Sequence, residues 1–120
     1  MTLRERYGLQ FVKSYSEEYD LTSYRCVSNG TLPAPHVNFN LCFIDHLSLV
    51  EVEDFIQLLD DALSDRPYDD QFITDGTEAD KVFLQSPDVI INDTLSLPIT
   101  DMKELLVEWL AFIKPTSKNF

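Results

Sequence analysis

The strongest pattern of apolar and polar positions in the chain lies between Ser48 and about Ser64. Apolar residues recur there at spacings of three and four, which places them on one face of a helix. Ser48 suits the N-cap, and Glu51 three residues later completes a capping box. Leu47 and Val52 fit a hydrophobic staple across that cap. We therefore predict an amphipathic helix here. Its core-facing residues are Val52, Phe55, Ile56, Leu59 and Leu63.

A second apolar stripe with helical spacing follows Pro98. Thr100 is placed to cap this helix, and Asp101 in its first turn is favourable to the helix dipole. Lys114 and Pro115 end the helix, because proline disfavours helical geometry in the residue before it. The stripe consists of Met102, Leu105, Leu106, Trp109, Phe112 and Ile113. We interpret its tryptophan as a core residue rather than a platform for a ligand.

Three segments in the first half of the chain have the composition or the alternation of strands. They are Leu9–Tyr15, Leu21–Ser28 and His36–Ile44, with a turn at Ser16–Tyr19 between the first two. The third segment is the most regular, because every second residue from Val37 to Phe43 is apolar. Such a strand has one buried face and one partly wet face. This is typical of an antiparallel sheet that helices cover on one side.

Two shorter strands, at Lys81–Gln85 and Val89–Ile91, are predicted on either side of a tight turn that contains Pro87. The loop from Tyr68 to Ala79 has room for one more short strand, at Gln71–Thr74. Because three strands precede the first long helix, we predict an antiparallel meander. The expected fold is a single α+β domain over residues 1–120. Its two layers are an antiparallel sheet of five to six strands and two amphipathic helices packed on one face of that sheet.

The charge balance narrows the choice of partner. The 120 residues include 21 acidic and 9 basic residues, for a formal net charge of -12. This charge repels phosphate backbones and anionic membranes, so we predict neither nucleic acid nor membrane as a partner. A basic protein partner fits the charge, although net negative charge also keeps a small protein soluble. No apolar run approaches the ~20 residues of a membrane span, and Met1–Arg6 leads into no signal core, so we expect a cytoplasmic protein.

Few residues are candidates for catalysis. The histidines, His36 and His46, are interpreted as structural, and the chain contains no metalloprotease, phosphate-loop or nucleophile-elbow motif. Cys26 and Cys42 are expected to be buried, reduced thiols within strands, with a disulfide as the alternative. The sequence therefore predicts no enzyme and no cofactor.

The acidic residues do not form a recognisable metal site. The set Asp69, Asp70, Asp75 and Gly76 does not match the ligand spacing of an EF-hand loop, and no glutamate follows at the closing position. Neighbouring carboxylates such as Asp60 and Asp61 point apart on a helix, so they do not form an acid–base dyad.

Negative charge is concentrated in one quarter of the chain. From Glu51 to Asp80 there are 11 acidic residues and one basic residue, Arg66. Concentrated like charge lowers stability by self-repulsion, which a cationic partner would offset. The alternative interpretation is a solvated face with no partner. The predicted partner-binding set gives the charge role to Asp60, Asp61, Asp65, Asp69 and Asp70, with Tyr68 and Phe72 as aromatic anchors.

The overall plan of the chain resembles the immunity proteins of bacterial polymorphic toxin systems, notably those of contact-dependent growth inhibition. The resemblance rests on three features: the strand meander, the acidic helix after the third strand, and the closing run Leu97–Leu110, a helix that ends near a tryptophan. The resemblance implies a small cytoplasmic protein, monomeric without its partner, that binds and neutralises a toxin domain encoded beside it. Many such toxins are nucleases with basic clefts, which an acidic face can plug by mimicking phosphates.

An acidic secretion chaperone of the type III kind is the alternative class. Such chaperones are similar to this chain in size, charge and α+β composition, and they form homodimers that wrap an effector segment. They usually begin with a helix, whereas the patterns above predict strands first. Oligomeric state separates the two classes, since a tight homodimer favours the chaperone and a monomer favours the immunity protein.

Overall fold

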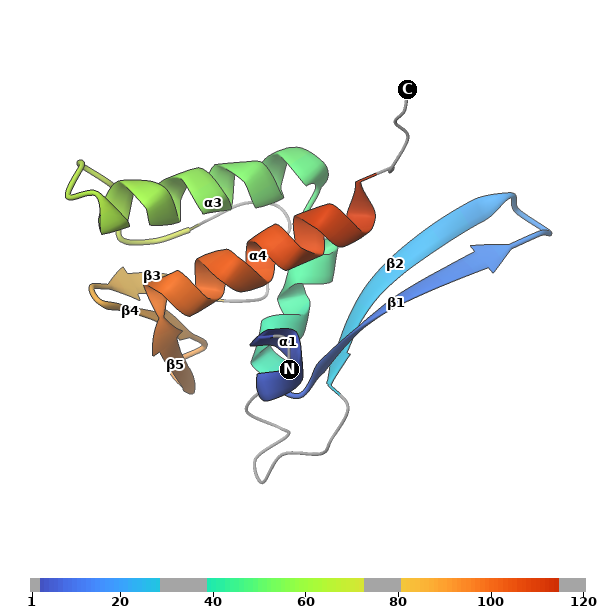
Figure 1. Ribbon diagram of the computed structural model, residues 1–120, viewed down its shortest axis with the longest axis horizontal. Helices are drawn as coiled ribbons and strands as arrows, with labels where there is room; N and C mark the ends of the chain where they lie inside the picture. The colour runs from blue at the N-terminus through green and yellow to red at the C-terminus, as the bar shows by residue number, and fades with distance from the viewer. Residues whose placement is uncertain (1–2, 29–38, 73–80, 115–120) are drawn as a thin grey trace.

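The hydrogen-bonding pattern of the backbone divides the strands between two separate antiparallel sheets (Figure 1). The computed structural model describes residues 3–28, 39–72 and 81–114. The described part is an α+β structure that contains a two-stranded sheet and a three-stranded sheet. In chain order its elements are α1 (Leu3–Arg6), β1 (Leu9–Ser16), β2 (Leu21–Ser28), the 3-10 helix η1 (Phe39–His46), α3 (Leu49–Leu63), β3 (Val82–Gln85), β4 (Asp88–Ile91), β5 (Leu95–Pro98) and α4 (Ile99–Ile113).

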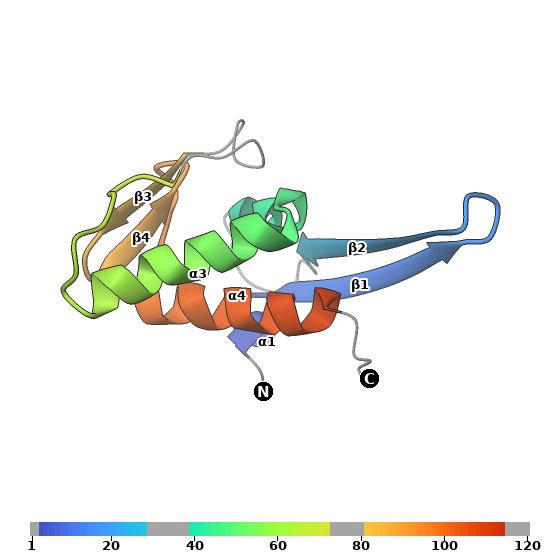
Figure 2. The same cartoon turned by 90° about the horizontal axis from the view of Figure 1, so that it is seen from above.

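Strands β1 and β2 form a hairpin that projects from the body of the molecule (Figures 1 and 2). The pairing runs from Leu9 opposite Ser28 to Ser16 opposite Leu21, which confirms both predicted strands. The base of the hairpin is anchored by Leu9 and Cys26, which are 2 % exposed. The far end, in contrast, carries exposed apolar side chains. They are Tyr15, Tyr19 and Leu21.

The second sheet is a meander in the order β3-β4-β5. Its first two strands confirm the strands predicted on either side of Pro87. Asn92 and Asp93 turn the chain into β5, both with φ of 55°, a left-handed conformation that short polar side chains tolerate. Gln71 makes only an isolated bridge to Phe83, and residues 73–74 of the predicted strand there lie outside the described residues.

The prediction of one sheet with five to six strands is wrong. Residues 39–46 of the segment expected to be the third strand form η1, and residues 36–38 lie outside the described residues. Leu41 and Ile44 of η1 are buried at the spacing of three that matches the three residues per turn of a 3-10 helix, and Phe43 between them is buried as well. Apolar residues in the same segment also alternate with a period of two, as in a strand. Burial in the tertiary structure therefore decides between the strand and the helix. Without a third strand, the hairpin and the β3-β4-β5 sheet stay separate.

Helices α3 and α4 lie side by side and run in opposite directions (Figure 1). The capping box of α3 is confirmed, because the Ser48 N–H donates to Glu51 Oε1 at 2.8 Å and the Glu51 N–H donates to Ser48 Oγ at 3.2 Å. Leu63, predicted to face the core, is 44 % exposed. Helix α4 begins at Ile99 after Pro98, without a side-chain cap, so the predicted cap at Thr100 is wrong.

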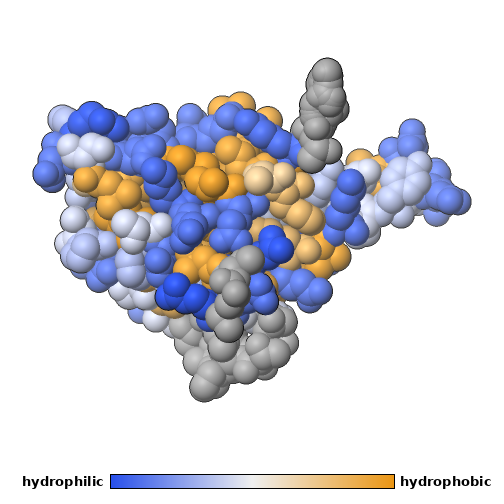
Figure 3. All heavy atoms as spheres, in the orientation of Figure 1, coloured by the Kyte–Doolittle hydropathy of each residue, from blue (hydrophilic) through white to orange (hydrophobic). Residues whose placement is uncertain are grey.

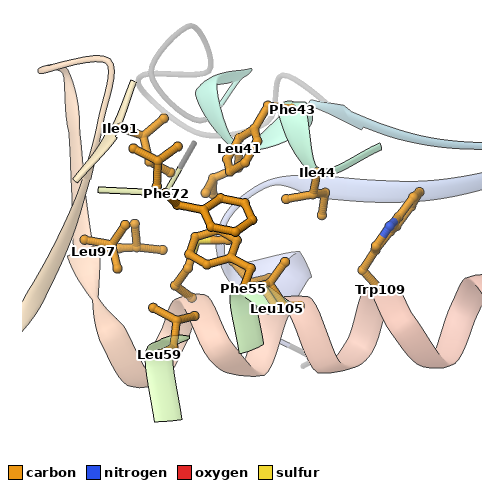
Figure 4. Packing of buried hydrophobic residues seen from close by; sticks show 14 of the residues in the cluster. Leu41, Phe43, Ile44, Phe55, Leu59, Phe72, Ile91, Leu97, Leu105 and Trp109 are labelled. Carbon is orange, nitrogen blue, oxygen red and sulfur yellow. The ribbon is translucent and has the colours of Figure 1, made fainter. Parts of the chain in front are cut away.

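The hydrophobic core is built from residues of both helices, of η1 and of the three-stranded sheet, and in Figure 4 it lies between α4 and η1. Trp109 of α4 is 2 % exposed, which confirms it as a core residue. Its ring meets Phe11 of β1 edge-on at 5.0 Å and also contacts Phe112. The tryptophan therefore attaches the hairpin to α4. Among the described residues, no helix is both long and apolar enough to span a bilayer.

Candidate functional site

The predicted partner-binding residues follow one another from the last turn of α3 into the segment that leads toward β3. On the face shown in Figure 3, hydrophilic residues and hydrophobic patches are mixed along the two long helices. We use the term acidic end for Asp60, Asp61, Asp65, Tyr68, Asp69 and Asp70.

Two carboxylates of the acidic end are already paired. Asp60 forms an ion pair with Lys103 of α4, which joins the two helices. Asp61 accepts a hydrogen bond from Arg66 Nε at 2.8 Å and another from Gln57 Nε2 at 3.0 Å. The bond from Arg66 is the main reason that the pKa of Asp61 lies below its ordinary value. These contacts hold the residues in place and neutralise part of their charge.

Three other carboxylates of the acidic end are exposed. No ion pair in the described part of the chain involves Asp65, Asp69 or Asp70. Their backbone is nevertheless held, because the Asp70 carbonyl oxygen accepts a hydrogen bond from the Leu84 N–H of β3 at 2.8 Å. Tyr68, between them in sequence, is 37 % exposed. An exposed aromatic ring and three available carboxylates therefore share a short, anchored segment.

Phe72, the second predicted anchor, is not on this surface. It is 7 % exposed and its ring stacks on Phe55 of α3 (Figure 4). Its N–H also donates to the Val82 carbonyl oxygen at 3.0 Å. A buried side chain with these contacts stabilises the fold, so the prediction that it contacts a partner is incompatible with its position. Asp75, Glu78 and Asp80, the last three acids of the acidic stretch, lie outside the described residues.

The charges of the acidic end are unfavourable for α3 itself. A helix carries partial negative charge at its C-terminus, where acidic side chains are destabilising and basic ones stabilising. The last turn of α3 contains no basic residue, whereas Asp60 and Asp61 lie in that turn and Asp65 follows it. In the described part of the chain, the contacts that offset this cost are the pairs with Lys103 and Arg66 and the hydrogen bond from Gln57.

A second site is a cavity of about 390 Å³ beside η1 and the end of β2. Its chemically active lining consists of Arg25, Cys26, Cys42, Asp45 and His46. Asp45 Oδ2 accepts a hydrogen bond from the Cys26 N–H at 2.9 Å, and His46 Nε2 lies 3.3 Å from Asp45 Oδ1. The bond from Cys26 holds η1 against β2 at the cavity, whereas the His46 contact lies within η1.

The two thiols meet at this cavity as free cysteines, and the Cys26 thiol hydrogen-bonds to Cys42. That bond lowers the pKa of Cys42, with help from a backbone hydrogen bond at Ser28 and the charge of Arg25, while burial and Asp45 act against it. The pKa of Cys26 is raised by the same bond and by burial. Both cysteines are free, Cys26 is buried as expected, and Cys42 is only half-buried. Cys42 lies in η1 and not in the strand expected there, which is why the sequence does not indicate that the two residues share a cavity.

Comparison of the chain with protein-family models, with curated proteins and with solved structures gives no match. The acidic end and the cavity are therefore the two features of the molecule that bear on its function.

Proposed function

We propose that this protein binds and neutralises a basic protein partner through its acidic end, as the immunity proteins that it resembles do with toxin domains. One observation carries the proposal: Asp65, Asp69 and Asp70 are exposed beside Tyr68, with no ion pair in the described part of the chain. Exposed carboxylates this close together repel one another, and a cationic partner would offset that repulsion. A basic nuclease cleft has the matching charge.

The proposed contact combines charge with an aromatic anchor. Clustered carboxylates steer the protein toward a cationic surface. At low salt this raises the association rate constant from ~10⁵–10⁶ toward 10⁸–10⁹ M⁻¹s⁻¹. Tyr68 supplies the apolar area that charge alone does not, since tyrosine is enriched among residues that dominate interface energies. The association rate is therefore expected to fall steeply as ionic strength rises, while the dissociation rate changes little.

The test compares two double variants with the same change in net charge. Asp65→Lys with Asp69→Lys reverses the acidic end, and Glu17→Lys with Glu18→Lys makes an equal change at the exposed turn of the hairpin. The probe is the purified toxin-like domain encoded next to this gene, and the measurement is Kd by titration calorimetry. We expect the first pair to weaken binding at least ~10-fold, about 1.4 kcal/mol, and the second pair to change it much less. Equal affinities for the wild type and the first variant would remove the acidic end from the interface.

The hairpin supports a second candidate, the homodimeric secretion chaperone. In the described part of the chain neither β1 nor β2 pairs with a further strand, and Tyr15, Tyr19 and Leu21 are exposed. Open strand edges and exposed apolar side chains can accept an added strand. Sedimentation equilibrium separates the candidates. A homodimer that Leu21→Glu dissociates would favour the chaperone, and a monomer at all concentrations would exclude it.

A further inference from the structure

Two cysteines that are distant in sequence lie against each other in the second site. Cys26 belongs to β2 and Cys42 to η1, two elements that pack together. Both side chains line the same cavity, and a hydrogen bond between them is the first cause of the pKa shift of each. The Cys26 N–H also donates to the Asp45 carboxylate one turn of η1 beyond Cys42, which holds the two backbones in this arrangement.

The surroundings of Cys42 favour its thiolate. The donors come from β2: the Cys26 thiol, a backbone hydrogen bond at Ser28 and the positive charge of Arg25. Asp45 of η1 is the negative group that opposes them, and His46 completes the titratable lining of the cavity. A thiolate is the form of cysteine that reacts with electrophiles, and donors or a nearby cation increase its population.

Access to the two sulfurs is unequal. Cys26 is 2 % exposed, whereas Cys42 is half-buried and both line the cavity. A small reagent from solvent therefore has readier access to Cys42 than to Cys26. A reactive thiol with a second thiol in reach is the arrangement of redox-sensing cysteines.

We propose that Cys42 and Cys26 form an oxidation site for hydrogen peroxide, with Cys42 as the attacking thiol and Cys26 as the resolving thiol. The Cys42 thiolate attacks one peroxide oxygen, an S–O bond forms, and the O–O bond breaks to release hydroxide, which becomes water with the proton that the Cys42 thiol gave up. The Cys26 sulfur then attacks the Cys42 sulfenic acid. The S–S bond forms, the S–O bond breaks, and the departing hydroxide takes the Cys26 proton as water. Overall, two thiols lose two electrons to one peroxide, and two waters are released.

The disulfide would tie β2 to η1, across the connection through residues 29–38. Cytosolic disulfides of this kind are transient, so a thiol reductant returns the pair to the state seen here. The inference does not depend on the acidic end or on its partner.

The experiment treats the full reduced chain with hydrogen peroxide near stoichiometric amounts and follows its intact mass. We expect the loss of two hydrogen atoms per chain, the loss of both titratable thiols, and a Cys26–Cys42 cross-linked peptide in a non-reducing digest. A thiol reductant should reverse all three. Over-oxidation of Cys42 with Cys26 still free, disulfide-linked dimers, or two unreactive thiols would each overturn the proposal.

Matched variants test the two roles separately. Cys26→Ala removes the resolving thiol, so Cys42 should accumulate as sulfenic acid that a dimedone probe labels. Cys42→Ala removes the attacking thiol, so Cys26, being buried, should stay unlabelled and unoxidised while the chain is folded. Circular dichroism confirms folding of each variant. Labelling of Cys26 in the folded Cys42→Ala chain at the rate seen for Cys42 would contradict the assignment of roles.

Discussion

The rings of Phe55 and Phe72 stack face to face, with centroids 4.1 Å apart and planes inclined by 12°. Phe55 lies in the middle of α3, and Phe72 lies in the segment that follows this helix. The stack therefore fastens the acidic end to the core. It also explains why an aromatic residue beside several aspartates is not a surface anchor.

Removing this ring should cost stability. Phe72→Ala is expected to lower the free energy of unfolding by about 3–5 kcal/mol, the usual result of truncating a buried phenylalanine. Tyr68→Ala, four residues earlier on the exposed side, should cost much less. Urea denaturation followed by circular dichroism measures both. Similar losses for the two variants would contradict the burial difference between them.

The caps of the two long helices should respond differently to the same substitution. Ser48→Ala breaks the capping box of α3 and should lower the free energy of unfolding by about 1 kcal/mol. Thr100→Ala should leave it nearly unchanged, because Thr100 lies within the first turn of α4 and makes no cap there. Chemical denaturation measures the free energy of unfolding of both variants. If Thr100→Ala lost as much stability as Ser48→Ala, the result would support the cap that the sequence predicts at Thr100.

Tyr7 links the start of the chain to α4. Its hydroxyl donates to Asp101 Oδ2 at 2.7 Å. Removing it in Tyr7→Phe should cost about 1–2 kcal/mol at neutral pH, as expected for a partly buried bond to a charged acceptor. The pKa of Tyr7 is raised above its ordinary value of 10.0. Burial is the main cause, and the hydrogen bond to Asp101 is the second.

This shift predicts a pH dependence with a definite sign. Because the folded state holds the Tyr7 proton more tightly than the unfolded state, the contribution is complete below pH 10.0 and is lost as pH rises above it. The stability advantage of the wild type over Tyr7→Phe should therefore shrink in alkaline solution. An advantage that stays constant above that pH would contradict the shift.

The thiol pair predicts an acid-shifted reactivity. Alkylation of Cys42 by iodoacetamide should reach half its maximal rate below pH 9.0, the ordinary value for a thiol, because donors stabilise the thiolate. In Cys26→Ala the midpoint should move up, since the thiol donor is lost. The rate is read from peptide mass spectrometry across a pH series. Identical midpoints in the two proteins would show that Cys26 does not act on Cys42.

Local patterns predicted the elements whose signals lie within a few neighbouring residues. Strand β2 has the predicted bounds, and α3 begins at the predicted cap. Both depend on short-range information: strand-forming composition in one case, and a serine three residues before a glutamate in the other. The acidic end was likewise visible, because its charges are close together in sequence.

Residues 39–46 could not be assigned locally. Their apolar residues satisfy a period of two and also a spacing of three, so neither sequence pattern excludes the other. What separates the alternatives is contact with distant residues. Asn40 Oδ1, for example, accepts a hydrogen bond at 2.9 Å from Asn92 Nδ2, which belongs to the turn before β5.

By itself, the sequence determined the α+β composition, the hairpin, the capped helix and the presence of an acidic stretch. Only the tertiary structure decided that the strands form two sheets, that Phe72 belongs to the core, and that Cys26 meets Cys42 beside a cavity. The reason is physical. Helix caps and turns are set by neighbouring residues, whereas burial and side-chain pairing depend on how elements from distant parts of the chain share one core.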